Sequence, residues 1–216
     1  MHFLFMTVKN NIKTKSNKDP YHHGDLRNTL INTARSLLEK NGEEALSLRG
    51  VARKVGVSRA APYHYFKSKS ALLSAVATVG YMELTDTMVE EAKSAITPND
   101  MLNKLGVGYI KFSVKHPQLF ILMSDPVLDI NGTSSELSNA REASAAPLLE
   151  AVAACIPNGT KEQIGAGGAA AWSIVHGMAT LYNNKRLSSL LDTHDLEYSA
   201  QMVTHQLDVT KILTFS

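Results

Sequence analysis

Apolar residues recur at intervals of three and four along most of the chain, which is the spacing that gathers them on one face of an α-helix. Leu26, Leu30 and Ala34 begin the first such stripe. No segment shows the strict alternation of apolar and polar residues that is typical of a strand. The pattern therefore predicts an all-α fold of about nine helices. The predicted helices cover approximately residues 25–41, 47–55, 58–66, 69–96, 98–116, 118–123, 134–154, 160–186 and 195–212.

Residues that favour helix ends mark several of these boundaries. Asp25, Ser58 and Thr97 can each accept a hydrogen bond from a free backbone N–H at the start of a helix. Gly56 permits a sharp reversal between the second and third helices. The segment 160–163, Thr-Lys-Glu-Gln, has the spacing of a capping box, which predicts a helix start there.

Charge is distributed unevenly and divides the chain into two parts. Residues 1–80 carry 13 Lys/Arg and 5 Asp/Glu, a balance of +8, whereas residues 81–216 carry 9 and 15, a balance of −6. A basic N-terminal part is typical of a protein that meets a polyanion, although an ordinary solvated surface explains the same charge. The sign changes near residue 84, inside the long fourth predicted helix, and we expect the functional boundary there.

Two short predicted helices separated by a Gly-containing turn, within residues 47–69, form a helix-turn-helix pattern. At about 100° per residue, the second of these two helices has a basic, hydrogen-bonding face and a mostly apolar face. The first face holds Arg59, Ala60, Tyr63, His64 and Lys67, and the second holds Ala61, Pro62, Tyr65 and Phe66. This division suits a helix that packs on a core and enters the major groove of DNA. Pro62 lies near the fourth residue of the helix, so we expect a distorted or partly 3₁₀ segment.

The residue types in this motif indicate how it would contact DNA. Arg59 is the expected base reader, because its planar fork matches the two acceptors on a guanine edge. Tyr63, His64 and Lys69 are expected at phosphates, which position a protein without specifying sequence. The predicted DNA-binding residues are Ser47, Arg49, Ser58, Arg59, Ala60, Tyr63, His64, Lys67 and Lys69, with His22 and His23 as further phosphate candidates.

The segments LSLRGVARKVGVS and YHYFKSKSALL resemble the N-terminal signature of TetR-family transcriptional regulators. The resemblance covers residues 24–84 and implies a DNA-binding domain there. Residues 1–23 are then a flexible basic arm, and residues 85–216 an effector-binding and dimerisation domain. Ala60-Ala61-Pro62 departs from the Gly-Thr/Ala-Leu/Ile type of sequence in many members, which bears on the operator preference. The resemblance implies a homodimeric repressor that binds palindromic double-stranded DNA and is released by a small-molecule effector.

The C-terminal part is similar to the branch of that family named for a Trp-His-Gly motif, through residues 172–177 and 116–120. Its aromatic and Met side chains either line a hydrophobic effector cavity or fill the core, which is their commoner role. The predicted effector-binding residues are Met101, Tyr109, Phe112, Phe120, Met123, Trp172, His176 and Met178. The last two predicted helices offer faces for a partner subunit or for packing within the chain. The predicted dimer-interface residues are Gly165, Gly168, Ala169, Leu196, Ala200, Val203 and Leu207.

Other chemistry is sparse. Cys155 is the only cysteine, which excludes an intrachain disulfide and fits a reducing cytoplasm. No apolar stretch reaches the roughly 18 residues that a membrane span needs. The eight histidines lack metal-ligand spacing, and neither a nucleophile elbow nor a phosphate loop is present. We therefore expect no metal, no cofactor and no enzymatic activity. His176 could bind a ligand or a metal and Cys155 could be a redox sensor, but the commoner roles are a satisfied core histidine and an inert thiol.

Three alternatives to a repressor stay open at this point. An activator of the same fold would have the same sequence features. An enzyme on a DNA-tethered scaffold would need a catalytic motif, which we do not find. A protein-interaction module without DNA binding would not need the cluster of Arg59, Tyr63, His64 and Lys69.

Overall fold

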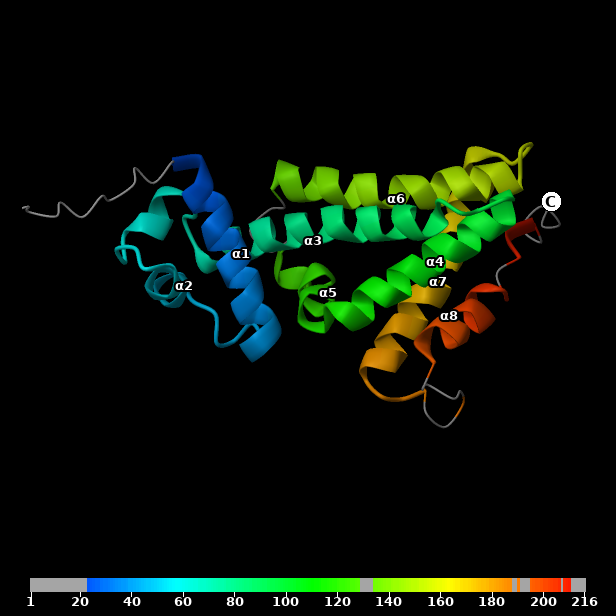
Figure 1. Ribbon diagram of the computed structural model, residues 1–216. Coiled ribbons are helices and arrows are strands. Elements are labelled where there is room, and N and C mark those ends of the chain that lie inside the picture. Colours follow the sequence, from blue (N-terminus) through cyan, green and yellow to red (C-terminus); the bar gives the residue numbers. More distant parts are fainter. Residues whose placement is uncertain (1–22, 129–133, 188–189, 191–194, 207, 211–216) are drawn as a thin grey trace, which may run out of the picture.

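The computed structural model describes residues 23–128, 134–187, 190, 195–206 and 208–210, and its regular elements in these ranges are all helices (Figure 1). The all-α prediction is therefore confirmed. The elements are α1 (His23–Asn41), α2 (Leu48–Val55), the 3₁₀ helix η1 (Ala61–His64), α3 (Lys69–Ala92), α4 (Pro98–Lys115), α5 (Pro117–Met123), the 3₁₀ helix η2 (Pro126–Leu128), α6 (Ser135–Cys155), α7 (Lys161–Asn183) and α8 (Leu196–Thr204).

Each predicted helix has a counterpart, but some boundaries were wrong. The third is the four-residue 3₁₀ helix η1, α3 ends at Ala92 rather than near residue 96, and α8 ends at Thr204 rather than near residue 212. The short helix η2 was not predicted. Residues 1–22 of the predicted arm lie outside the described residues, and His23, the last residue assigned to that arm, is the first residue of α1.

The structure shows which of the predicted N-cap residues bind a free backbone N–H at the start of a helix. Thr97 Oγ1 accepts from the Asp100 N–H at 3.1 Å, and the Thr160–Gln163 capping box is complete. Helix α1 begins at His23, two residues before Asp25, so Asp25 is not its N-cap. The Ser58 side chain also makes no cap, and its carbonyl oxygen accepts from the Ala61 N–H at 3.1 Å. Two of the four predicted N-caps were therefore wrong.

Helix α3 is the long element that connects the two ends of the molecule. Figure 1 shows α1 and α2 at one end of α3, α7 and α8 towards the other, and α6 running alongside α3. Helix α3 packs against α1 and α5 as well as against α4 and α6. The buried apolar side chains form one continuous cluster, from Leu30 in α1 through Leu72 and Leu84 in α3 to Val175 in α7. Residue 84 lies in the interior of this helix.

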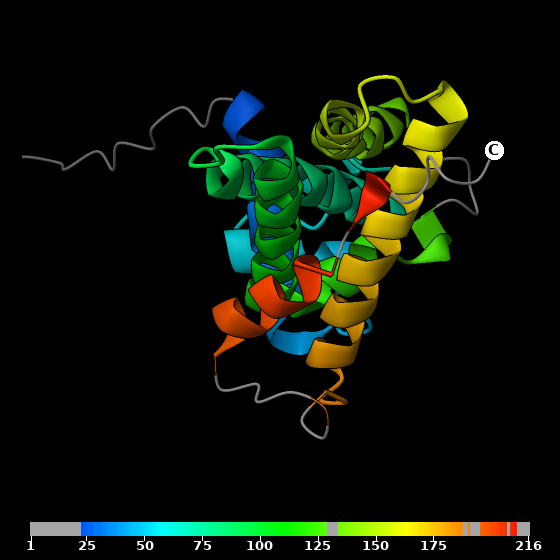
Figure 2. The same ribbon diagram turned by 90° about the vertical axis from the view of Figure 1, so that its right-hand side faces the viewer.

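The C-terminal part is a layered helical bundle. Helices α3, α4 and α6 pack on one another, α7 covers α4 and α6, and α8 packs on α4 and α7. Turned by 90°, the molecule shows α7 running along one side of this bundle, with α8 beside it (Figure 2). No helix among the described residues is both long and apolar enough to cross a membrane.

The crossing of α4 over α3 depends on Gly108. A Cβ atom at this position would lie 2.8 Å from Met88 Cα and 3.0 Å from the Thr87 carbonyl oxygen, both of which are backbone atoms of α3. Backbone cannot move aside as a side-chain tip can, so the two helix axes approach closely only because residue 108 has no side chain.

Replacing Gly108 with alanine should therefore lower the free energy of unfolding by about 1–3 kcal/mol, the usual cost of overpacking a well-packed site. Urea denaturation measures this change. Gly177→Ala in α7 is the matched control, because its Cβ would meet no atom within 4 Å. The control should leave stability unchanged or raise it, since alanine favours a helix more than glycine does. Wild-type stability of Gly108→Ala would contradict the close crossing.

Candidate functional site

The helix-turn-helix segment is built from α2, a tight turn and η1. Ser47 Oγ accepts from the Gly50 N–H at 3.1 Å and so caps α2. At the other end, Gly56 has φ 82°, a left-handed conformation that favours glycine. The N–H groups of Gly56 and Val57 both donate to the Ala52 carbonyl oxygen at 3.0 Å. These bonds close α2 and redirect the chain into η1.

Pro62 explains why the second helix of this motif is a 3₁₀ helix. It is the second residue of η1, where a missing N–H costs little because helix starts leave their first N–H groups unpaired. Its ring is buried, and its carbonyl oxygen accepts from the N–H groups of Tyr65 and Phe66. The expectation of a partly 3₁₀ segment at this proline is confirmed.

The division of this segment into two faces is also confirmed. The exposed side chains are those of Arg59, Ala60, Tyr63, His64 and Lys67, whereas Pro62 and Phe66 are buried and Ala61 and Tyr65 are half-buried. Tyr63 is 50% exposed, so a binding partner can reach its side chain. Arg49 on α2 is exposed as well. A cationic and hydrogen-bonding surface therefore lies on the end of the molecule away from α7.

Lys69 was predicted at a phosphate, but it already has partners within the chain. Its Nζ donates to the Glu43 carbonyl oxygen at 2.8 Å and lies 3.4 Å from the Glu43 carboxylate. This side chain ties the start of α3 to the loop after α1. Ser47, another predicted DNA contact, uses its hydroxyl to cap α2.

A cavity of about 350 Å³ lies within the C-terminal part, lined by residues of α3 to α7. Of the predicted effector-binding residues, Tyr109, Phe120, Met123 and Trp172 line it. Met101, Phe112, His176 and Met178 are not among its lining residues. Phe112 and Met178 are almost fully buried in the core instead, and Met101 is partly buried against it. Hydrophobic spacing alone cannot separate a core position from a cavity wall.

A polar cluster supports one wall of the cavity. The Tyr109 hydroxyl accepts from Trp172 Nε1 at 3.2 Å and lies 2.8 Å from His176 Nδ1. In the neutral tautomer that carries its proton on Nε2, His176 accepts from this hydroxyl at Nδ1. Burial raises the pKa of Tyr109 to about 12 and lowers the pKa of His176, so both side chains are neutral near pH 7. His176 therefore supports the wall from behind rather than lining the cavity.

Sequence reasoning missed the contribution of α6 to this cavity. Helix α6 supplies Arg141, Ser144, Ala145, Leu148 and Leu149, and α3 supplies Tyr81, Leu84 and Met88. The apolar residues of α6 are not confined to one face of the helix, and its sequence offered no signal for which side faces the cavity.

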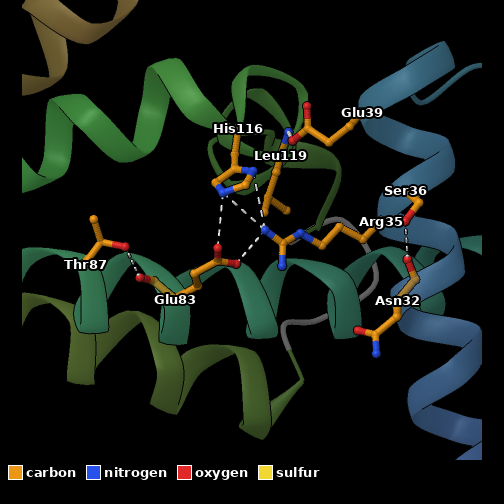
Figure 3. Close-up of polar contacts among 8 residues, drawn as sticks. All are labelled: Asn32, Arg35, Ser36, Glu39, Glu83, Thr87, His116 and Leu119. Atoms are coloured by element: carbon orange, nitrogen blue, oxygen red, sulfur yellow. Dashed lines mark hydrogen bonds and ion pairs between the residues drawn. The ribbon is translucent and has the colours of Figure 1, made fainter.

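A polar network joins α1 to α3, α4 and α5 (Figure 3). The Glu83 carboxylate pairs with the Arg35 guanidinium and with His116 Nε2, the latter at 3.1 Å. Glu39 accepts from the N–H groups of Gln118 and Leu119, at 3.3 and 3.0 Å, at the start of α5. Burial lowers the pKa of His116, and the Arg35 and Lys115 charges act in the same direction, while Glu83 and Glu39 oppose them. None of these residues was predicted to have a role.

The predicted dimer-interface residues fall into two groups. Gly165 and Ala169 on α7 are exposed. Gly168 and Ala200 are buried within the chain, and Leu196 and Val203 are partly buried against its core, so these four pack at least in part against their own subunit. Leu207 lies outside the described residues. The large exposed apolar side chains on α7 and α8 are Trp172, Ile174, Leu181, Tyr198 and Met202.

The described residues offer little other chemistry. No group of three or more His, Cys, Asp or Glu side chains among them could hold a metal ion. Burial raises the pKa of Cys155, which disfavours a reactive thiolate.

Comparison with known proteins agrees with this architecture. Residues 30–76 match the model for bacterial regulatory proteins of the tetR family, and residues 102–207 match the model for a tetracyclin repressor-like C-terminal domain. The chain is 34% identical over 79 residues to the HTH-type transcriptional regulator BetI of Rhizobium meliloti (strain 1021). That match spans 37% of this chain and 39% of the length of BetI.

Solved structures share the fold over nearly their whole length. A protein of unknown function from Rhodococcus sp. RHA1 is 30% identical, with a TM-score of 0.72, and the match covers 88% of this chain and 99% of that one. The TetR-family regulator PfmR from Thermus thermophilus is 18% identical, with a TM-score of 0.57, and the match covers 82% of this chain and 96% of that one. At 18% identity, the similarity to PfmR shows a shared fold only.

The exposed basic surface around η1 and the tight turn before it define a helix-turn-helix protein of the kind that binds DNA. Together with the two matched segments, they identify the chain as a member of the TetR family of bacterial transcriptional regulators.

Stability should fall as the solution becomes acidic, in part through His176. Its pKa is below the ordinary value of 6.5 in the folded chain, so the unfolded chain binds the proton more readily. The stabilisation is present above pH 6.5 and is lost as the pH falls below it. Urea unfolding between about pH 7.5 and 5.5 should show a smaller pH dependence for His176→Gln than for wild type. An NMR titration that gave His176 a pKa above 6.5 would contradict the assignment.

Proposed function

We propose that this regulator is a repressor that binds duplex DNA as a homodimer and releases it when a small molecule occupies the cavity. The observation that carries the proposal is the exposed set of Arg59, Tyr63, His64 and Lys67 on a short segment around η1 whose other side is anchored in the core by Pro62 and Phe66. Such an element can enter a groove without unfolding. The regulator would act in the cytoplasm.

The division of labour on this surface follows from side-chain chemistry. Arg59 can donate two parallel hydrogen bonds to a guanine edge, and Lys67 and Arg49 carry charges suited to phosphate. Ser47, Ser58, Ala60 and His64 are exposed next to them and complete the proposed contact surface. Lys69 would act indirectly, by holding the base of the motif through Glu43.

A homodimer is proposed because one short recognition element gives too few contacts for a specific site, whereas twofold symmetric proteins match palindromic operators. Helices α7 and α8 expose the large side chains of Leu181, Tyr198 and Met202, which a partner subunit would cover. Gly165 and Ala169 lie exposed on the same α7 and would allow a partner helix to approach closely.

Helix α5 supports a route from the cavity to the DNA-binding surface. Its side chains Phe120 and Met123 line the cavity, and its first N–H groups, at Gln118 and Leu119, donate to Glu39 on α1. A molecule that displaces α5 would therefore displace α1, to which the helix-turn-helix is attached. Until a ligand binds, the Arg35–Glu83–His116 contacts would hold α1 in the arrangement described here.

Arg59→Ala should weaken binding to a duplex selected from random sequences by about tenfold or more, because a good bidentate pair contributes about 1–3 kcal/mol of base discrimination. The preference over random competitor should fall with it, and affinity should decrease as salt rises. Fluorescence anisotropy measures both quantities. Arg186→Ala is the matched control, since Arg186 is an exposed arginine near the end of α7. Unchanged sequence preference in Arg59→Ala would refute the assignment of the recognition element.

Glu39→Ala should expose the first N–H groups of α5, because their acceptor is removed. Hydrogen–deuterium exchange should accelerate at Gln118 and Leu119, and binding to the selected duplex should weaken severalfold although no DNA-facing side chain has changed. Lys40→Ala, at the exposed neighbouring position, should do neither. Faster exchange with unchanged DNA affinity would contradict the role of this contact in positioning the helix-turn-helix.

A reporter gene under the selected operator, in cells with and without the regulator, decides the direction of control. Expression that rises when the regulator is absent supports a repressor, and expression that falls would favour an activator of the same fold.

A further inference from the structure

We infer that the cavity accepts a small neutral molecule with an apolar body of about one or two rings and no charged group. The inference rests on the proposed function, because it concerns the same cavity, and it specifies the charge, the polarity and the size of the effector. Its basis is that the polar side chains of the cavity lining are already engaged within the chain or are open to water.

The walls of the cavity are mainly apolar. Leucine and methionine side chains from α3, α4, α5 and α6 line it together with the rings of Tyr109, Phe120 and Trp172. A volume of about 350 Å³ is at the small end of the range for small-molecule pockets, which limits the ligand to about one or two rings. Flat rings suit such walls, because offset and edge contacts between rings are favourable.

The polar side chains that α3 and α6 contribute to the lining have partners within the chain. The Tyr81 hydroxyl donates to the Met123 carbonyl oxygen at 2.7 Å, and the Ser144 hydroxyl donates to the Arg141 carbonyl oxygen at 2.7 Å. The Arg141 guanidinium lies 5.8 Å from the centre of the Tyr81 ring, in a cation–π contact. A polar ligand would have to compete with these contacts.

The polar side chains that α4 and α7 contribute pair with each other. Trp172 Nε1 donates to the Tyr109 hydroxyl at 3.2 Å, and this hydroxyl lies 2.8 Å from His176 Nδ1. Ser124 is the remaining polar side chain among the described lining residues, and it is exposed, so water can satisfy its hydroxyl. A ligand with many hydroxyl or amide groups would lose its hydrogen bonds to water and find few replacements. Sugars and nucleosides are therefore poor matches.

The charge of the lining selects against ions of either sign. A cation, even a quaternary ammonium group that aromatic rings can otherwise bind, would meet the positive Arg141 and no Asp or Glu among the described lining residues. An anion would lose its hydration beside apolar walls, and the positive charge of Arg141 is already in contact with the Tyr81 ring. A neutral apolar body avoids both costs.

A competition experiment with one ring body in three charge states tests the inference. The neutral fluorescent probe is N-phenyl-1-naphthylamine. Trp172 is the only tryptophan of the chain and lines the cavity, so energy transfer from Trp172 to the probe reports occupancy. The competitors are 4-methylbiphenyl, which is neutral, 4-phenylbenzoate, which is anionic, and 4-phenylbenzylamine, which is cationic at neutral pH. The neutral compound should displace the probe at concentrations about tenfold or more below those that either ion requires.

Two substitutions on α6 show whether the compounds occupy the cavity. Ala145→Phe adds a ring at a lining position and should weaken the probe and 4-methylbiphenyl by about tenfold or more, because the added ring takes up ligand space. Ala143→Phe is the matched control, since Ala143 is exposed on the same helix and is not a lining residue. It should leave both affinities unchanged. Circular dichroism establishes that each variant is folded, and Ser144→Phe, at the next lining position, replaces Ala145→Phe if that variant does not fold.

Displacement of the probe by either ion at the same or a lower concentration than 4-methylbiphenyl would overturn the neutral ligand but leave the cavity as a binding site. Absence of energy transfer from Trp172 to the probe would overturn the inference together with the proposed effector site. Undiminished binding in Ala145→Phe would place the compounds outside the cavity and have the same consequence. DNA binding by Arg59 is measured separately and does not depend on these results.

Discussion

The position of the DNA-binding segment relative to the cavity depends on one partly buried polar network at the base of α1. Glu39 supplies the acceptors that the start of α5 lacks, and Glu83 holds Arg35 and His116 together across three helices. Apolar packing alone would allow α1 to slide or rotate against α3, because it is not directional. Hydrogen bonds to charged groups fix one arrangement, and they are strongest where water is partly excluded.

Most of the fold could be predicted because it rests on local chemistry. Thr97 and the Thr160–Gln163 box mark helix starts by bonds that span only three residues, and Gly56 marks a turn by its own backbone conformation. The errors have local causes too. The prediction placed the start of α1 two residues too late, at Asp25, since a sequence pattern defines helix ends less sharply than helix interiors. The predicted Ser58 cap is absent because Pro62 makes the following element a 3₁₀ helix.

The two parts of the candidate site differed in how far the sequence could predict them. The exposed and buried faces around Arg59 follow from angular position on a short element, which the sequence determines. The cavity instead depends on which side of α6 meets α3, and that choice is made by helices distant in the chain. Arg141 and Glu39 show the same limit: Glu39 accepts from Leu119, 80 residues away, and no short-range pattern encodes such a pair.

Helix α3 gives the DNA-binding end and the cavity a common axis. It begins at Lys69, just after the helix-turn-helix, and continues without interruption to Ala92, past Tyr81, Leu84 and Met88 on the cavity wall. A hybrid regulator that joins this cavity to another DNA-binding domain must therefore have its junction within a helix. Adding or deleting one residue at the junction rotates the DNA-binding domain by about 100° and moves it by about 1.5 Å relative to the cavity. Only junctions that preserve the helical phase would keep the orientation that the proposed coupling between the cavity and the DNA-binding segment requires.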